Sequence, residues 1–325
     1  MSHYNRRMDF TLSDAQRAWQ EKARALAHGW PREGLSAAVA ASAHAAGLFS
    51  SDLDALTAVA IVEAAGVEHP VGTVTLALQV AVNVSLAGAV SLQPSTGRAV
   101  ALSSETRPQL DGSTLTGRAL WVGPIAQETA AIVGAAQGSE TVACAVAPGA
   151  AGVSLEPIHA AGLHGFDCAH LTFDKTPCVA IGSPKPVMAR VRVLLAAAGI
   201  GMGRRAAREA LKAAMAYGRT GAGGEQTVQG LLADAATELD AAMLLVHHAA
   251  LRAPMSLAQA SMAKLAATEA AQRAVARATQ IVGAESFSEG HILEQLTQDV
   301  RALELFAGRT EALREAVADE VLPRT

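Results

Sequence analysis

Cysteine is scarce in this sequence. Three cysteines occur among 325 residues, and their uneven spacing includes no Cys-x-x-Cys pair. A disulfide-rich secreted domain and a cysteine-based zinc site are therefore excluded, because each needs several cysteines at characteristic spacings. We expect reduced, structural thiols at Cys144, Cys168 and Cys178, and a cytoplasmic protein with no metal site.

Clusters of basic residues and long apolar runs are also missing. The formal net charge is −4, and the Lys and Arg residues are scattered, so the sequence has no electrostatic footprint for nucleic acid or a membrane surface. Apolar runs such as 193–200 are far shorter than the ~20 residues of a membrane-spanning helix. The polar N-terminus lacks the apolar segment of a secretory signal. We therefore expect neither nucleic acid nor a membrane as a partner.

Aromatic residues make up 3% of the chain, whereas alanine is abundant. Alanine is the best helix former, so the first part of the chain is predicted to be helical. Ser13 is placed to cap a first helix that ends near Ala27. Further helices are expected over 34–47, 52–65 and 72–92.

The middle of the chain differs in character. Between residues 98 and 184, short apolar runs alternate with turn dipeptides such as Asp111-Gly112 and Pro148-Gly149, which indicates an antiparallel β domain. After it, four long helical segments are expected over 186–219, 226–252, 255–282 and 291–320, and they predict a four-helix bundle. The chain is therefore predicted to be mainly α with a β domain. Its three predicted domains are a helical domain over 1–97, the β domain over 98–184 and the four-helix bundle over 185–325.

Several weak motifs follow this order of domains. They are Leu12-Ser13-Asp14-Ala15-Gln16, Asp111-Gly112 with Leu115-Thr116-Gly117 and Trp121, Gly162-Leu163-His164-Gly165, Val228-Gln229 with Leu232-Ala233-Asp234, and Gln280-Ile281-Val282-Gly283. In this order and spacing the chain resembles the acyl-CoA dehydrogenases. The resemblance implies an N-terminal helical domain, a middle antiparallel β domain and a C-terminal four-helix bundle. It also implies an FAD-dependent enzyme that oxidises the Cα–Cβ bond of an acyl-CoA thioester, with a glutamate that removes the α-proton.

The sequence departs from this family at the catalytic position. The residue that aligns with the family's glutamate is Ala307, which has no proton acceptor, so no catalytic residue is assigned. The region 184–208, where some family members carry the base instead, contains no Asp or Glu. Glu304 is the nearest substitute, and we expect it to be a solvated surface carboxylate.

The resemblance implies five cofactor-binding positions. These are Ser103, Trp121, Arg219, Gln280 and Gly283. Around them the family pattern is eroded: the loop after Ser103 is shortened, Gly123 replaces a hydroxyl residue that supports the flavin, and Ser286 replaces a glycine. Added bulk at such a glycine is expected to hinder the approach of a phosphate to the backbone.

Three functions agree with these observations. In the first, the chain is a degenerate subunit that assembles with another acyl-CoA dehydrogenase-type chain, as a homo- or hetero-oligomer, and helps complete a neighbour's FAD site. In the second, it is a self-sufficient flavoprotein of altered chemistry in which Glu304 replaces the base. In the third, it is a non-enzymatic scaffold that keeps the fold.

Overall fold

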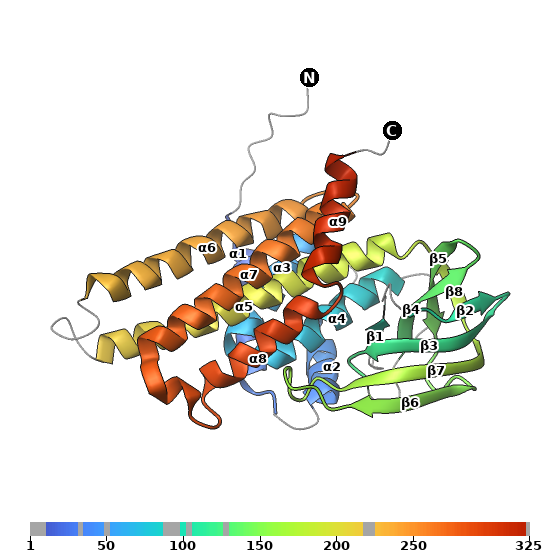
Figure 1. Ribbon diagram of the computed structural model, residues 1–325, viewed down its shortest axis with the longest axis horizontal. Coiled ribbons are helices and arrows are strands. Elements are labelled where there is room, and N and C mark those ends of the chain that lie inside the picture. Colours follow the sequence, from blue (N-terminus) through green and yellow to red (C-terminus); the bar gives the residue numbers. More distant parts are fainter. Residues whose placement is uncertain are drawn as a thin grey trace, which may run out of the picture.

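A computed structural model describes residues 11–31, 35–48, 53–86, 98–101, 106–125, 130–216 and 225–322. In these residues, four helices come first, eight strands follow, and a second set of helices comes last. Figure 1 shows the helices of both sets packed together in one body, with the sheet at one end. The predicted order of helical, β and helical regions is therefore confirmed.

The N-terminal helices begin where the sequence offers capping groups. The Ser13 side chain accepts a hydrogen bond from the Gln16 backbone N–H, and the Gln16 side-chain oxygen accepts one from the Ser13 backbone N–H, so the predicted cap is confirmed. Asp54 caps α3, because its carboxylate accepts hydrogen bonds from the backbone N–H and the hydroxyl of Thr57. The helices are α1 (Asp14–His28), α2 (Leu35–Ala45), α3 (Ala55–Glu68) and α4 (Pro70–Leu86).

The strands form one sheet with the order β6-β7-β3-β2-β4-β5-β8, and β1 also pairs with β4. They are β1 (Arg98–Ala101), β2 (Gln109–Asp111), β3 (Thr114–Val122), β4 (Ala130–Gln137), β5 (Glu140–Val146), β6 (Val153–Ile158), β7 (Cys168–Pro177) and β8 (Val179–Gly182). The prediction of a purely antiparallel sheet is wrong at two pairs, because β4 runs parallel to β1 and β2. The β2–β3 hairpin reverses the direction of the chain, and the chain reverses again before β4. Strand β4 therefore runs in the same direction as β2.

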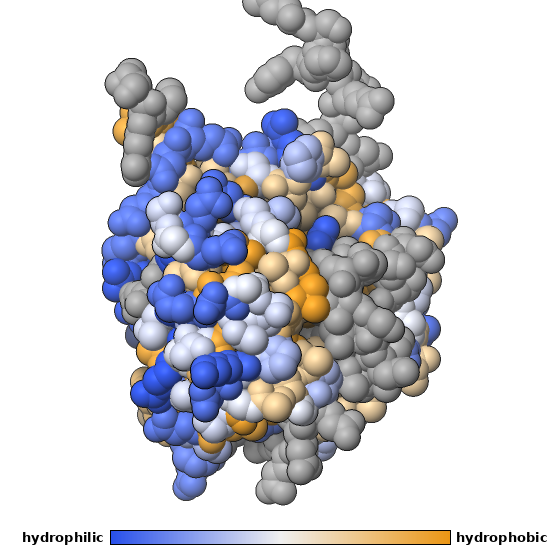
Figure 2. All heavy atoms as spheres, turned by 90° about the vertical axis from the view of Figure 1, so that its right-hand side faces the viewer, coloured by the Kyte–Doolittle hydropathy of each residue, from blue (hydrophilic) through white to orange (hydrophobic). Residues whose placement is uncertain are grey.

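The sheet is buried on both faces at β4 and β5. Ile132 and Ala143 belong to the large core that runs through the helices, whereas Val133 and Cys144 belong to a smaller core between β4, β5, β3 and β7. This alternation is the two-residue period of a strand. Figure 2 looks onto the sheet end of the molecule, where apolar side chains gather near the middle beside a more polar side.

The C-terminal helices differ from the expected bundle at the last helix. They are α5 (Lys185–Ala216), α6 (Gln226–Ala250), α7 (Leu257–Val282), the short 3₁₀ helix η2 (Gly283–Phe287), α8 (Ile292–Leu305) and α9 (Thr310–Val321). The predicted single helix over 291–320 is wrong, because the chain leaves the helix after Leu305. Ala307 and Gly308 have φ angles of 57° and 117°, which no right-handed helix allows.

Close packing explains the glycines of α5. A Cβ atom on Gly201 would lie 2.5 Å from the carbonyl oxygen of Glu63 in α3, and one on Gly203 would lie 3.2 Å from the Cα of Ala271 in α7. These glycines therefore let three helices approach one another closely. Among the described residues, α5 alone is long and apolar enough to cross a membrane, but 83% of its apolar window is buried inside the protein.

Candidate active site between the sheet and the helices

The loop between α8 and α9 carries Ala307, the residue at which the resemblance places the base. Its left-handed backbone is held by Arg192 of α5, whose Nε donates a 3.2 Å hydrogen bond to the Ala307 carbonyl oxygen. A Cβ atom on the next residue, Gly308, would lie 2.8 Å from the Arg192 guanidinium. Glycine at 308 and arginine at 192 are therefore matched to each other, and together they fix the loop.

Lys264 of α7 is a second buried cation beside this loop. Its ammonium group donates hydrogen bonds of 2.9 Å and 3.0 Å to the carbonyl oxygens of Glu304 and Gly308. Burial and the nearby Arg192 charge lower the pKa of Lys264 to about 7, although Glu304 opposes the shift. Burial alone lowers the pKa of Arg192 to about 10. The sequence shows no sign of either role, because the two residues lie at least 40 positions before the residues that they bind.

Glu304 is buried, so the prediction of a solvated surface carboxylate is wrong. One carboxylate oxygen accepts a 2.6 Å hydrogen bond from the Thr310 hydroxyl, and the other accepts short hydrogen bonds from Gln272 and Arg301. Burial raises the pKa of Glu304, but these donors outweigh it and the net pKa is lowered. The carboxylate is therefore ionised at neutral pH, with both oxygens engaged.

Asp299 ties the β region to α8. Its carboxylate accepts a 2.5 Å hydrogen bond from the Leu163 backbone N–H. A Cβ atom on Gly162 would lie 2.5 Å from the Gln298 carbonyl oxygen, so this loop can lie against α8 only with glycine at 162. Burial raises the pKa of Asp299 to about 6. This contact fixes the sheet relative to the loop that carries Ala307.

Trp121, expected to cover a flavin, lies at the end of β3 with half of its surface exposed. Its ring meets His170 edge-on, and its backbone N–H donates to His170 Nδ1. A side chain at Gly123 would collide with Phe166, which packs edge-to-face on Phe306 at 5.4 Å between ring centroids. The structure thus brings the end of β3 and the Ala307 loop together, and it leaves no room for a hydroxyl residue at 123.

Gln280 and Gly283 lie elsewhere. They stand at the C-terminal end of α7, at the end of the helical body opposite the sheet (Figure 1). Gln280 is exposed, Gly283 has a φ of 79°, and a Cβ atom there would have nothing within 4 Å. Ser286, expected to hinder the approach of a phosphate, is buried and its hydroxyl donates to the Gly283 carbonyl oxygen. Ser103 and Arg219 lie outside the described residues.

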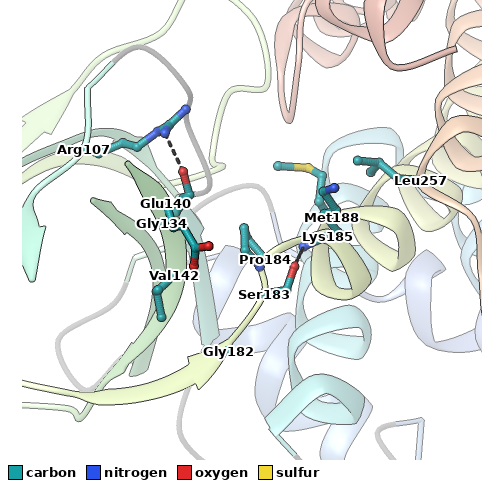
Figure 3. Close-up of a pocket in the computed structure, with 11 residues that line it drawn as sticks. Arg107, Gly134, Glu140, Val142, Gly182, Ser183, Pro184, Lys185, Met188 and Leu257 are labelled. Carbon is teal, nitrogen blue, oxygen red and sulfur yellow. Dashed lines mark hydrogen bonds between the residues drawn. The ribbon is translucent and has the colours of Figure 1, made fainter. Parts of the chain in front are cut away.

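A cleft of about 600 Å³ separates the sheet from the helices. Figure 3 shows residues of the sheet on one side, with Met188 of α5 and Leu257 of α7 across the open space. Arg107 and Lys185 supply positive charge to its walls, and Arg107 is oriented by a hydrogen bond to the Thr141 hydroxyl. Among the described residues, no cluster of three or more His, Cys, Asp or Glu could hold a metal ion.

These features match only part of an FAD site within one chain. A half-exposed tryptophan can stack on a flavin ring, and the cations of the cleft suit phosphates. However, the hydroxyl position at Gly123 is filled by Phe166, and Gln280 and Gly283 face outward at the far end of the helices. Within one chain, the described members of the expected set, Trp121, Gln280 and Gly283, therefore do not gather around one place.

Comparison with known proteins agrees with this architecture. A family model described as acyl-CoA dehydrogenase, C-terminal domain, matches residues 185–322. Benzylmalonyl-CoA dehydrogenase of Aromatoleum aromaticum is 27% identical over 259 residues, which cover 72% of this chain and 68% of that protein. Cyclohexane-1-carbonyl-CoA dehydrogenase of Geobacter metallireducens is 30% identical over 100 residues. This match covers 30% of this chain and 26% of that protein.

Two solved structures share the fold over almost the whole chain. Butyryl-CoA dehydrogenase from Megasphaera elsdenii superposes with a TM-score of 0.82 at 17% identity, covering 97% of this chain and 100% of that one. A glutaryl-CoA dehydrogenase from Mycobacterium smegmatis, in complex with FADH2, gives 0.80 at 15% identity and covers 96% of each chain. At these identities the likeness establishes the fold alone.

Proposed function

We propose that this chain, which has the acyl-CoA dehydrogenase fold and matches that family's C-terminal domain over residues 185–322, is a degenerate subunit of an FAD-dependent acyl-CoA dehydrogenase complex. A second chain of the same fold supplies the glutamate that removes the α-proton. This chain contributes the exposed end of α7 to the partner's flavin site. The complex oxidises the Cα–Cβ bond of an acyl-CoA thioester.

The single observation that carries the proposal is the state of the base position. Ala307 has no proton acceptor, although Arg192 and Lys264 still hold its loop. The nearest carboxylate, Glu304, has both oxygens occupied by donors. Loss of a positioned base costs roughly a hundredfold to ten-thousandfold in rate, so the chain alone is a poor catalyst of this reaction.

The positions of the cofactor residues support sharing between chains. FAD supplies the hydride acceptor in this family. In this chain, the Gln280 amide can donate hydrogen bonds to a neighbour's cofactor, and the open Gly283 backbone allows close approach of a phosphate. Both stand at an exposed helix end, where they can reach another subunit.

The substrate class follows from the family and is an acyl-CoA thioester. The names of the curated relatives point to aromatic and alicyclic acyl groups, such as benzylmalonyl-CoA and cyclohexane-1-carbonyl-CoA. We propose that a test panel contain these thioesters beside butyryl-CoA. The three free thiols suit a reducing compartment, and a cytoplasmic location is part of the proposal.

The test is co-expression with acyl-CoA dehydrogenase chains that keep the catalytic glutamate. Turnover of each thioester is followed with an artificial electron acceptor for this chain, the partner and the co-purified complex. We expect negligible turnover by this chain alone, and at least tenfold more from the complex than from the partner alone. Equal turnover by the partner with and without this chain would contradict the proposal.

A self-sufficient enzyme is the second candidate, and the ionised, buried state of Glu304 favours it. In this account Glu304 leaves its donors and acts as the base. Glu304→Gln would then abolish turnover by the isolated chain and leave bound flavin unchanged, whereas Glu311→Gln, on the exposed start of α9, would change neither. A scaffold protein would bind neither FAD nor an acyl-CoA, with or without a partner.

A further inference from the structure

Two of the three thiols lie against each other in the β region. Cys144 on β5 is fully buried, and Cys178 lies just before β8, partly exposed. In the β5–β8 ladder Cys144 faces Ala180, so Cys178, two residues earlier, is its diagonal neighbour on the same side of the sheet. Both side chains pack into the smaller core of the sheet, and they lie near enough for each to affect the pKa of the other.

The pair is asymmetric. Burial raises the pKa of Cys144 to about 12, and the proximity of Cys178 adds to the shift, so Cys144 keeps its proton. Burial also raises the pKa of Cys178, but the neighbouring Cys144 thiol works in the opposite direction. Cys178 is the more accessible thiol, and the buried Cys144 is placed behind it as a resolving thiol.

Cys168 has a different setting. It is buried on β7, and its pKa is raised to about 12 by burial and by the neighbouring Asp167 carboxylate, with no contribution from another thiol. It therefore serves as an internal control for the chemistry of the pair.

We propose that Cys144 and Cys178 form a reversible disulfide when the protein meets a peroxide. The Cys178 thiolate attacks the peroxide, the O–O bond breaks, and Cys178 becomes a sulfenic acid while the peroxide leaves as an alcohol or water. The Cys144 thiol then attacks the Cys178 sulfur, an S–S bond forms, and one water molecule leaves. The peroxide is reduced by two electrons, and the two thiols are oxidised by two.

The bond would join the two sheet segments that form one wall of the cleft. Val142 of β5 and Gly182 of β8 both line the cleft, and Ala143 pairs with Gly182. Oxidation would therefore fix the distance between these segments near one end of the cleft. The inference is independent of the proposed function, because it concerns thiols that no step of that function uses.

The experiment treats the full-length chain with hydrogen peroxide at pH 8.5 and maps its peptides without reduction. In the folded protein, we expect the 144–178 cross-link to exceed each of the other two pairings at least tenfold, and dithiothreitol to reverse it. Cys168→Ala should leave this result unchanged, whereas Cys178→Ser should remove every intramolecular disulfide.

The same reaction in 8 M urea provides the comparison. In an unfolded chain, the shorter loop between Cys168 and Cys178 closes more readily than the loop between Cys144 and Cys178. The proposal is supported if the cross-link between Cys144 and Cys178 predominates in the folded protein but not in urea. The same distribution of pairings in both states, or conversion of Cys178 to sulfinic acid without a cross-link, would overturn it.

Discussion

Lys264 donates a 2.9 Å hydrogen bond to the carbonyl oxygen of Glu304, so a fully buried ammonium group holds the last turn of α8. A second bond from the same group reaches Gly308, beyond the break that carries Ala307. The loop that would present a catalytic base is thus kept in place although the base is gone. This relationship is what a subunit retained for assembly would preserve.

Replacement of Lys264 with methionine tests how much this clamp stabilises the fold. Lys264→Met keeps the volume of the side chain but leaves two buried carbonyl groups without a donor, at a cost of about 1–3 kcal/mol each. We expect the free energy of unfolding to fall by ~2–4 kcal/mol in urea titrations. Lys212→Met, at an exposed position on α5, should change it by less than ~0.5 kcal/mol. Equal effects of the two variants would contradict the clamp.

The stability of the protein should depend on pH through Asp299. Because its pKa is raised to about 6 from 3.8, the folded state binds more protons than the unfolded state between these values. Its contribution to stability is therefore largest at low pH and is lost as the pH rises from about 4 to about 6.

Asp299→Asn checks this sign. The amide oxygen can still accept the Leu163 hydrogen bond, but no buried charge forms. We expect the free energy of unfolding of the variant to be about 1–2 kcal/mol higher than that of the wild type at pH 7. Near pH 4 the two proteins should be equally stable. Asp111→Asn, at an exposed turn, should follow the wild type. A variant less stable than the wild type at pH 7 would contradict the assignment.

Restoring the base should not restore the enzyme. Ala307→Glu places a carboxylate at the proposed base position, but under the proposal the flavin contacts are still shared between two chains. We expect the isolated variant to stay inactive with butyryl-CoA, and the complex to keep the rate of the wild-type complex. Turnover by the isolated Ala307→Glu chain at a rate typical of the family would show that only the base was missing.

The exposed end of α7 should matter only in the complex. Gln280→Ala removes an amide from this end, and we expect a three- to tenfold loss of bound flavin per complex with an unchanged free energy of unfolding. Gln137→Ala, at the exposed end of β4, is the matched control and should lose no flavin. Unchanged flavin content in the Gln280 variant would remove this residue from the proposed shared site.

The order of the regions could be predicted from the sequence, because helix capping at Ser13 and turn signals such as Asp111-Gly112 are local. The break at Ala307 could not, because its left-handed backbone is held by Arg192, 115 residues earlier. The burial of Glu304 could not be predicted either, because one of its hydrogen-bond partners, Gln272, lies 32 residues earlier in the sequence.

The two thiols illustrate the same limit. The contact between Cys144 and Cys178 depends on the register of β5 against β8, which no spacing in the sequence reveals. Local chemistry therefore predicts the elements of this chain, whereas the candidate site depends on contacts between residues distant in the sequence.

The most direct test of the central claim is the flavin content of the chain expressed alone in a flavin-replete host. Visible absorbance of the purified protein gives the amount of FAD per chain. The account predicts well under one-tenth of an FAD per chain alone, and a stoichiometric amount only in complex with a complete partner. About one FAD per isolated chain would contradict the shared site and direct attention to Glu304 as the base of a self-sufficient enzyme.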